Sequence, residues 1–227
     1  MSRRAAWGCV ALLGAAGSAA LLSACCGGGP TGPAILNDAT SLDPPLPPPA
    51  ADGGDPYPPT CNVQSFQNDK GNYAQADATC WVPAGIGQVW KALQDPTVTE
   101  DPHTTSFSVT NVPDSDPSHV LHQMIHYNLT DILQVSYDLE WIHVLDEGTV
   151  ADPDHVVITF QKVSGTSYVS LWADSFELTS PAAGVTKLVI SAHENAMTWS
   201  PTDLQKGILQ YYSNIGSKLG VPANVPQ

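Results

Sequence analysis

Basic residues are scarce in this chain of 227 residues, which has eight lysines and arginines against 22 acidic residues. Its only arginines are Arg3 and Arg4, close to the N-terminus. Without arginine, the rest of the chain cannot form the bidentate contacts that recognise phosphate, and its negative charge repels nucleic acid and anionic lipid. We therefore predict no nucleic-acid partner, and we interpret the acidity as solubility in an extracytoplasmic compartment.

Sequence motifs of catalysis, cofactor binding and metal binding are also missing. The chain has no Gly-x-Ser-x-Gly elbow, no glycine-rich phosphate loop after a strand and no repeated Cys-x-x-Cys spacing. His122 and His126 would share one face of a strand, but at a separation of roughly 13 Å they are too far apart to bind one ion together. We therefore predict no cofactor and no metal site.

Two pairs of ionisable residues remain as candidates for acid–base chemistry. They are the adjacent His193 and Glu194, and His143 with Asp146. Either pair would serve catalysis only if it faced a cavity, and such histidines are more often surface or loop residues. We therefore assign no catalytic residue, which argues against an enzyme.

The N-terminus is typical of an exported protein. An apolar and small-residue run from Val10 to Leu22 follows the two arginines, and it is too short to cross a bilayer, so residues 1–24 are predicted to be a signal peptide. The end of this run, Leu22-Ser23-Ala24-Cys25, resembles a bacterial lipobox. The resemblance implies cleavage before Cys25 and acylation of Cys25. An ordinary secretory signal and a twin-arginine signal are the alternatives.

Acyl chains on Cys25 would have to hold the protein at the membrane by themselves. After the leader, six lysines stand against 22 acidic residues, which gives a formal charge of −16. Such a chain is not drawn to an anionic surface by charge. The predicted location is the cell envelope. Because Cys26 rather than aspartate follows Cys25, resemblance to Gram-negative sorting signals implies the outer membrane if the organism has one.

Proline dominates the next segment, residues 25–60. Ten prolines lie between Gly27 and Thr60, with no lysine or arginine among them. Proline lacks an amide donor, and such a composition offers little to pack, so we predict a disordered tether with polyproline II stretches. The tether would act as a spacer between membrane and domain, or alternatively as a proline-rich ligand for an aromatic groove.

Residues 61–227 have the length of one domain. They contain two cysteines, Cys61 and Cys80, which in an oxidising compartment are predicted to form a disulfide. Two buried free thiols are the alternative.

Periodicity predicts the elements of this domain. Apolar residues alternate with polar ones, or gather in short apolar runs, over seven segments expected to be strands: 74–82, 105–112, 119–129, 133–143, 156–163, 168–178 and 185–193. Helical spacing predicts a short helix at 86–93. A long amphipathic helix is expected to begin after Ser200 as N-cap, with Pro201 in its first turn, and to end at Gly220.

This element order, together with one short motif, resembles the START/Bet v 1-like superfamily (SRPBCC; polyketide cyclases and lipid-transport proteins). The motif is the alternating strand that runs into Val82-Pro83-Ala84-Gly85 and then Val89-Trp90-Lys91-Ala92-Leu93-Gln94-Asp95-Pro96. The resemblance spans residues 61–220. It implies an α+β helix-grip fold, in which a curved antiparallel sheet of about seven strands wraps round the C-terminal helix and leaves an apolar cavity.

Inward-facing aromatic residues and the apolar stripe of the last helix are the candidate ligand contacts. They are Tyr137, Trp141, Tyr168, Trp172, Phe176, Ile208, Tyr211, Tyr212 and Ile215. Each could equally be an ordinary core residue. We expect a module that binds a hydrophobic small molecule or lipid. The alternatives are a cyclase- or hydratase-like enzyme and a filled-core domain that binds other envelope proteins, and the sequence identifies no protein partner.

Overall fold

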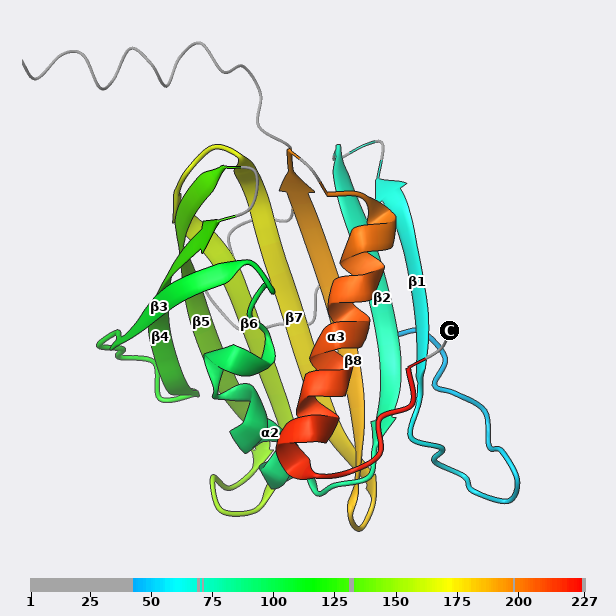
Figure 1. Cartoon of the computed structure of the whole chain (residues 1–227). Helices are drawn as coiled ribbons and strands as arrows, with labels where there is room; N and C mark the ends of the chain where they lie inside the picture. The colour runs from blue at the N-terminus through cyan, green and yellow to red at the C-terminus, as the bar shows by residue number, and fades with distance from the viewer. Residues whose placement is uncertain (1–42, 69, 71, 131–132, 198, 226–227) are drawn as a thin grey trace, which may run out of the picture.

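One curved sheet of eight antiparallel strands lies against a long C-terminal helix in the computed structural model of the chain (Figure 1). The structure describes residues 43–68, 70, 72–130, 133–197 and 199–225. The elements in chain order are β1 (Cys61–Asn68), β2 (Tyr73–Val82), α2 (Ile86–Leu93), η1 (Pro96–Val98), β3 (Thr104–Asn111), β4 (His119–Thr130), β5 (Gln134–Gly148), β6 (Pro153–Gly165), β7 (Val169–Ala182), β8 (Val185–Ala196) and α3 (Pro201–Leu219).

The strand order across the sheet is β1-β2-β8-β7-β6-β5-β4-β3. Strands β3 to β8 form a continuous antiparallel meander, and β2 joins it beside β8. The helices α2 and α3 lie on one face of this sheet (Figure 1). The predicted α+β helix-grip fold is therefore confirmed, with eight strands where the sequence pattern indicated about seven.

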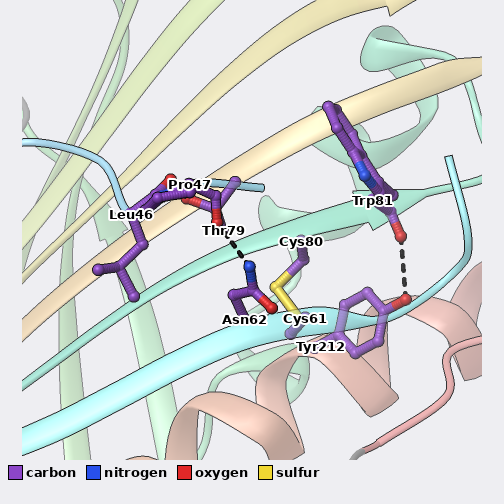
Figure 2. Close-up of a disulfide and its surroundings, with 8 residues drawn as sticks. All are labelled: Leu46, Pro47, Cys61, Asn62, Thr79, Cys80, Trp81 and Tyr212. Carbon is purple, nitrogen blue, oxygen red and sulfur yellow. Dashed lines mark hydrogen bonds between the residues drawn. A yellow bond between two sulfur atoms is a disulfide. The ribbon is translucent and has the colours of Figure 1, made fainter. Parts of the chain in front are cut away.

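Strand β1 is the additional strand. It pairs with β2 in register, so that Cys61 lies directly opposite Cys80 and the two form the predicted disulfide (Figure 2). The sequence gives little sign of this strand because Asn62 and Gln64 alternate with residues as different as Val63 and Ser65. Pairing with the edge of β2, rather than a buried face, places these residues in the sheet.

Both helices have the bounds that the sequence predicted. The Ser200 hydroxyl accepts a hydrogen bond from the backbone N–H of Asp203 at 3.3 Å, which caps α3 at its N-terminus. At the other end Gly220 has a φ of 68°, the left-handed conformation in which glycine terminates helices. Helix α2 spans Ile86–Leu93, as its helical spacing predicted.

Large side chains fill the space between the sheet and α3. Ile208, Tyr212 and Ile215 of α3 are fully buried in a single apolar cluster with residues from every strand except β3. The rings of Trp141 and Phe160 stack at a centroid separation of 4.2 Å. The Tyr212 hydroxyl donates to the backbone carbonyl of Trp81 at 2.9 Å (Figure 2). The middle of the helix-grip is thus a packed core.

Residues 43–49, here named the N-terminal strap, lie against the sheet on the face opposite α3. The Trp81 indole donates to the carbonyl of Pro49 at 3.0 Å, and the Thr79 hydroxyl donates to that of Leu46 at 2.8 Å. The Asn62 amide donates to the carbonyl of Pro47 at 2.7 Å (Figure 2). Proline carbonyls accept hydrogen bonds as well as any others, and these donors hold them in place.

Part of the segment predicted to be a disordered tether lies against the domain. The strap and residues 57–60 contact the domain, whereas residues 50–56 between them are exposed. Residues 25–42 of the predicted tether lie outside the described residues. The strap also explains why β2 is buried on both faces. Its outward residues Gln75, Asp77, Thr79 and Trp81 are each less than 10% exposed.

Candidate functional site

A cleft of about 420 Å³ opens between the N-terminal half of α3 and the sheet. Its walls include Trp172 of β7, Trp199 before α3, and Gly207 and Tyr211 of α3. The loop of residues 99–103 between η1 and β3 forms another side. The cleft thus combines aromatic walls with polar groups from the loop and from Asp203, Lys206 and Gln210 of α3.

Gly207 is the smallest of the α3 residues that line the cleft. A Cβ atom built at this position would meet only Cζ3 of Trp199, at 3.9 Å, which is ordinary van der Waals contact. A larger residue at this turn of the helix would project into the cleft, since Gly207 lines it.

A smaller hollow of about 100 Å³ adjoins the cleft and shares Asp101, His103 and Trp199 with it. Its remaining lining is mostly apolar and comes from strand ends and adjoining turns at one end of the sheet: Leu129, Leu133, Val135, Tyr168, Val169, Ala196 and Met197. Leu133, Tyr168 and Met197 are more than a third exposed. The entrance region therefore presents apolar side chains to solvent.

The loop of residues 99–103 is held in place by its own carboxylate and by α3. Asp101, which is 9% exposed, accepts a hydrogen bond from the backbone N–H of His103 at 2.7 Å, and its Oδ1 lies 2.9 Å from Nδ1 of the His103 ring. The Asn214 amide of α3 donates to the carbonyl of Val98 at 3.0 Å. This side of the cleft is therefore an ordered wall.

Two buried carboxyl groups lie behind the cleft, on the side of the sheet that faces α3. Trp172, Asp174 and Phe176 alternate along β7, and Phe176 packs against Tyr211 of α3, so Asp174 also points inward. Glu194 of β8 lies directly opposite Trp172. The Trp172 indole, itself a cleft residue, donates to Oδ2 of Asp174 at 3.3 Å.

Burial favours the protonated form of these two carboxyls. It raises the pKa of Asp174 well above its ordinary value, and the N–H groups of Trp172 and of the His193 backbone offset only part of this rise. Burial also raises the pKa of Glu194 well above its ordinary value, with further increases from the charges of Asp174 and Asp101. Among the described residues, Oδ1 of Asp174 and Oε2 of Glu194 have no hydrogen-bond partner. These atoms are polar groups in an otherwise apolar interior.

The adjacent His193 and Glu194 point to opposite faces of β8. Successive strand residues alternate, so Glu194 faces the helix side while Nε2 of His193 contacts Asp43 of the strap at 2.7 Å. His143 faces inward and is fully buried, where its Nδ1 accepts the Trp90 indole N–H at 3.1 Å. Burial lowers the pKa of His143 to about 3, so this ring is neutral.

The nine candidate ligand contacts fall into two groups. Trp172 and Tyr211 line the cleft, and Tyr168 lines the smaller hollow. The other six pack in the core: Tyr137, Trp141, Phe176, Ile208, Tyr212 and Ile215. Ligand contact remains a prediction for all nine. The sequence reasoning missed Trp199, Gly207 and Asp174, none of which stands out by spacing or motif.

Among the described residues, no helix is both long and apolar enough to span a bilayer. Cys25 and the predicted signal peptide lie outside these residues.

Comparison with known proteins relates this chain by structure only. Neither a protein-family model nor a curated protein sequence matches it. The human StarD13 (DLC2) lipid transfer and protein localization domain is similar over 71% of this chain and 85% of its own, with 11% identity and a TM-score of 0.54.

Two further solved structures are less similar. Human StAR-related lipid transfer protein 5 is matched over 70% of this chain and 82% of its own, at 11% identity and a TM-score of 0.48. The Zhui aromatase/cyclase from Streptomyces sp. R1128 is matched over 69% and 88%, at 12% identity and a TM-score of 0.38. At such identities the similarity to StarD13 concerns the fold alone, and the domain described here has the helix-grip fold of the START/Bet v 1-like proteins.

Proposed function

We propose that this domain binds one hydrophobic small molecule or lipid in the cleft between α3 and the sheet. The cleft itself is the observation that carries the proposal. Its volume of about 420 Å³ falls within the roughly 300–1,000 Å³ usual for small-molecule sites, and Trp172, Trp199 and Tyr211 supply apolar walls. The fold shared with a lipid transfer domain supports the same class of ligand.

The buried carboxyls suggest what else this ligand carries. A protonated Asp174 or Glu194 can donate one hydrogen bond and accept another. Trp172 connects the cleft wall to Asp174. Neither carboxyl lines the cleft, so a hydroxyl or carbonyl group of the ligand would have to displace the Trp172 indole to satisfy the oxygen atoms that lack partners among the described residues. A ligand that did so would be apolar with one polar group.

Native mass spectrometry tests this proposal. The purified chain, after incubation with an extract of neutral membrane lipids and removal of excess lipid, should show a mass increment for one bound molecule per chain. Fragmentation of the complex would identify the ligand class. A spectrum with only unliganded chain, before and after incubation, would contradict the proposal.

We further propose that the protein is a lipoprotein of the cell envelope, anchored through Cys25. The support is the sequence Leu22-Ser23-Ala24-Cys25 after an apolar run, and the large negative charge of the remaining chain, which disfavours attachment by charge. By the resemblance of the residues after Cys25 to Gram-negative sorting signals, the proposed location is the outer membrane if the organism has one.

A pair of cysteine variants tests the anchor. Cys25→Ser should abolish labelling by an alkyne-tagged fatty acid and move the protein out of the membrane fraction. Cys26→Ser, at the neighbouring cysteine, should leave both unchanged. If Cys25→Ser were found in the membrane fraction in the same amount as the wild type, this would contradict the anchor. The proposal for the cleft would not be affected.

A further inference from the structure

Three metal-ligating side chains meet at the connection between β3 and β4, at the edge of the sheet farthest from β1. Asp114 lies in this connection, and His119 and His122 lie at the start of β4. Oδ2 of Asp114 is 2.6 Å from Nδ1 of His119 and 2.6 Å from Nδ1 of His122. One ligand atom from each residue lies within 4.8 Å of the others.

A strand irregularity brings the two histidines together. Residues three apart in a regular strand point to opposite faces, which would separate the rings of His119 and His122. The register of β4 against β5 shifts between His119 and Leu121, which is the effect of a β-bulge. Because of this shift, both rings face the same carboxylate, and their centroids lie 6.1 Å apart.

The second nitrogen of His122 is oriented in the way that metal-bound histidines are. Its Nε2 lies 3.0 Å from Oε1 of Glu140, and the other oxygen of Glu140 accepts a hydrogen bond from the Gln161 amide at 3.2 Å. A metal-ligating histidine almost always donates its free ring N–H to such an oriented carboxylate or carbonyl. The pair of Glu140 and Gln161 therefore fixes the ring of His122.

With this orientation of the His122 ring, its contact with Asp114 requires a positive charge. A neutral imidazole has one donor nitrogen, so a ring that donates from Nε2 to Glu140 presents a lone pair at Nδ1. That lone pair faces the carboxylate oxygen of Asp114 at 2.6 Å, where two acceptors repel each other. Only a second proton on the ring or a cation shared by both atoms makes the contact favourable.

The surrounding charge favours a cation of more than one unit. Asp114, Asp116 and Glu140 all lie near the two rings, with Oδ2 of Asp116 4.0 Å from Nε2 of His119. Within the described part of the chain, lysine ion pairs involve Asp203 and Asp95 and none of these three carboxylates. Three carboxylates around two imidazoles therefore form a strongly negative site on an already acidic protein.

We propose that Asp114, His119 and His122 bind one divalent transition-metal ion through Oδ2 and the two Nδ1 atoms. Two imidazoles with one carboxylate suit Zn²⁺ and its first-row neighbours rather than Ca²⁺ or Mg²⁺, which prefer oxygen ligands. Zinc–nitrogen and zinc–oxygen bonds of about 2.0–2.2 Å place neighbouring ligand atoms roughly 3.3 Å apart in a tetrahedron. A small outward movement of Asp114, which lies in a surface connection, would reach this separation.

The site is open and lies apart from the cleft. The side chains of His119, His122 and Asp114 are 5%, 12% and 20% exposed, so solvent reaches the site without a large opening of the fold. Three protein ligands leave one tetrahedral position for water or for a group of another molecule. The proposal is independent of ligand binding in the cleft, since no residue of the site lines the cleft.

Zinc titration of the full chain, produced without a polyhistidine tag and stripped with a chelator, tests the site. Isothermal titration calorimetry should show one Zn²⁺ per chain, and elemental analysis after dialysis should recover it. Asp114→Asn and His122→Ala should each weaken binding at least about tenfold. Glu140→Gln should weaken it by about 10-fold or more, as expected when the partner of a ligand is removed.

His155 provides the matched control. Its ring also contacts two carboxylates, Asp146 at 2.8 Å and Glu177 at 3.1 Å, but it is not part of the three-residue group. His155→Ala should bind Zn²⁺ as the wild type does. Co²⁺ should give visible absorption bands in the wild type that Asp114→Asn removes. Binding below 0.1 equivalent, or binding that His155→Ala lowers as much as His122→Ala does, would overturn the proposal, and ring protonation would then explain the contact.

Discussion

Asp43 and His193 meet on the face of the sheet opposite α3, with Oδ2 of Asp43 2.7 Å from Nε2 of His193. The Ser191 hydroxyl bridges to the same carboxylate oxygen at 2.7 Å and to Oδ1 of Asp77 at 2.7 Å. The hydrogen bond with His193 is the main reason why the pKa of Asp43 is below its ordinary value. This contact joins the N-terminal strap to β8, far away in the sequence.

Asp43→Ala should release the strap while the domain stays folded. The substitution removes a partly buried charged hydrogen bond, which we expect to cost about 1 kcal/mol of local stability. Hydrogen exchange should therefore become about fivefold faster at residues 43–49, with β5 and β6 unchanged. Asp52→Ala, at an exposed position just after the strap, serves as the control. Equal exchange in both variants would show that Asp43 does not hold the strap.

The buried carboxyls should make the domain less stable as the pH rises. Unfolded aspartate and glutamate titrate near about 3.9 and 4.3, whereas burial raises the folded pKa values of Asp174 and Glu194. Between these values the folded state holds protons that the unfolded chain has released. The contribution of these two groups to the free energy of unfolding is therefore highest below about pH 4 and falls as pH rises towards their folded pKa values.

Asp174→Asn should remove part of the fall in the free energy of unfolding that accompanies rising pH. The difference in free energy of unfolding between variant and wild type should shift in favour of the variant by up to about 1.4 kcal/mol per pH unit until the folded pKa is reached. Urea unfolding at pH 5, 7 and 9 measures this slope. Asp152→Asn, at an exposed position, should run parallel to the wild type. Parallel curves for Asp174→Asn as well would mean that Asp174 is ionised in the fold.

Loss of the disulfide should weaken the whole domain. Cys61 and Cys80 are separated by 19 residues, and cross-linking a loop of this length contributes on the order of 3 kcal/mol by the chain-entropy estimate. Serine at both positions should lower the free energy of unfolding by about this amount, measured in urea. Reduced wild type should give the same value. A loss below about 1 kcal/mol would show that the pairing of β1 with β2 does not depend on the disulfide.

The pattern of the sequence was sufficient for most of the fold. Alternation or a short apolar run predicted seven of the eight strands, and all of these except β3 bury apolar residues in the core. Ser200 and Gly220 predicted the ends of α3 because capping depends on the local residues alone. Strand β1 was missed since its position depends on the edge of β2 and not on its own pattern. The contact of the N-terminal strap with the sheet was missed because a proline-rich sequence does not indicate which side chains will donate hydrogen bonds to its carbonyl groups.

The candidate site was less accessible from the sequence. Trp172 and Tyr211 were predicted from their strand and helix faces, but the same faces also supplied the core residues Phe176 and Tyr212. Trp199 lies in a connection without periodicity. Gly207 has no side chain, and that it lines the cleft can be seen only once the neighbouring residues are placed. The group of Asp114, His119 and His122 depends on a register shift in β4 that cannot be predicted from the residue pattern.

The central claim is that a ligand occupies the space beside Gly207. Binding of N-phenyl-1-naphthylamine, an uncharged fluorescent probe suited to a chain with a formal charge of −14, tests it in two variants of one position. Gly207→Ala adds only a Cβ in van der Waals contact and should bind the probe as the wild type does, with α3 more stable by about 0.5–1 kcal/mol. Gly207→Phe should fill the cleft and weaken binding at least about tenfold. Saturable binding of equal strength in Gly207→Phe and Gly207→Ala would contradict the account.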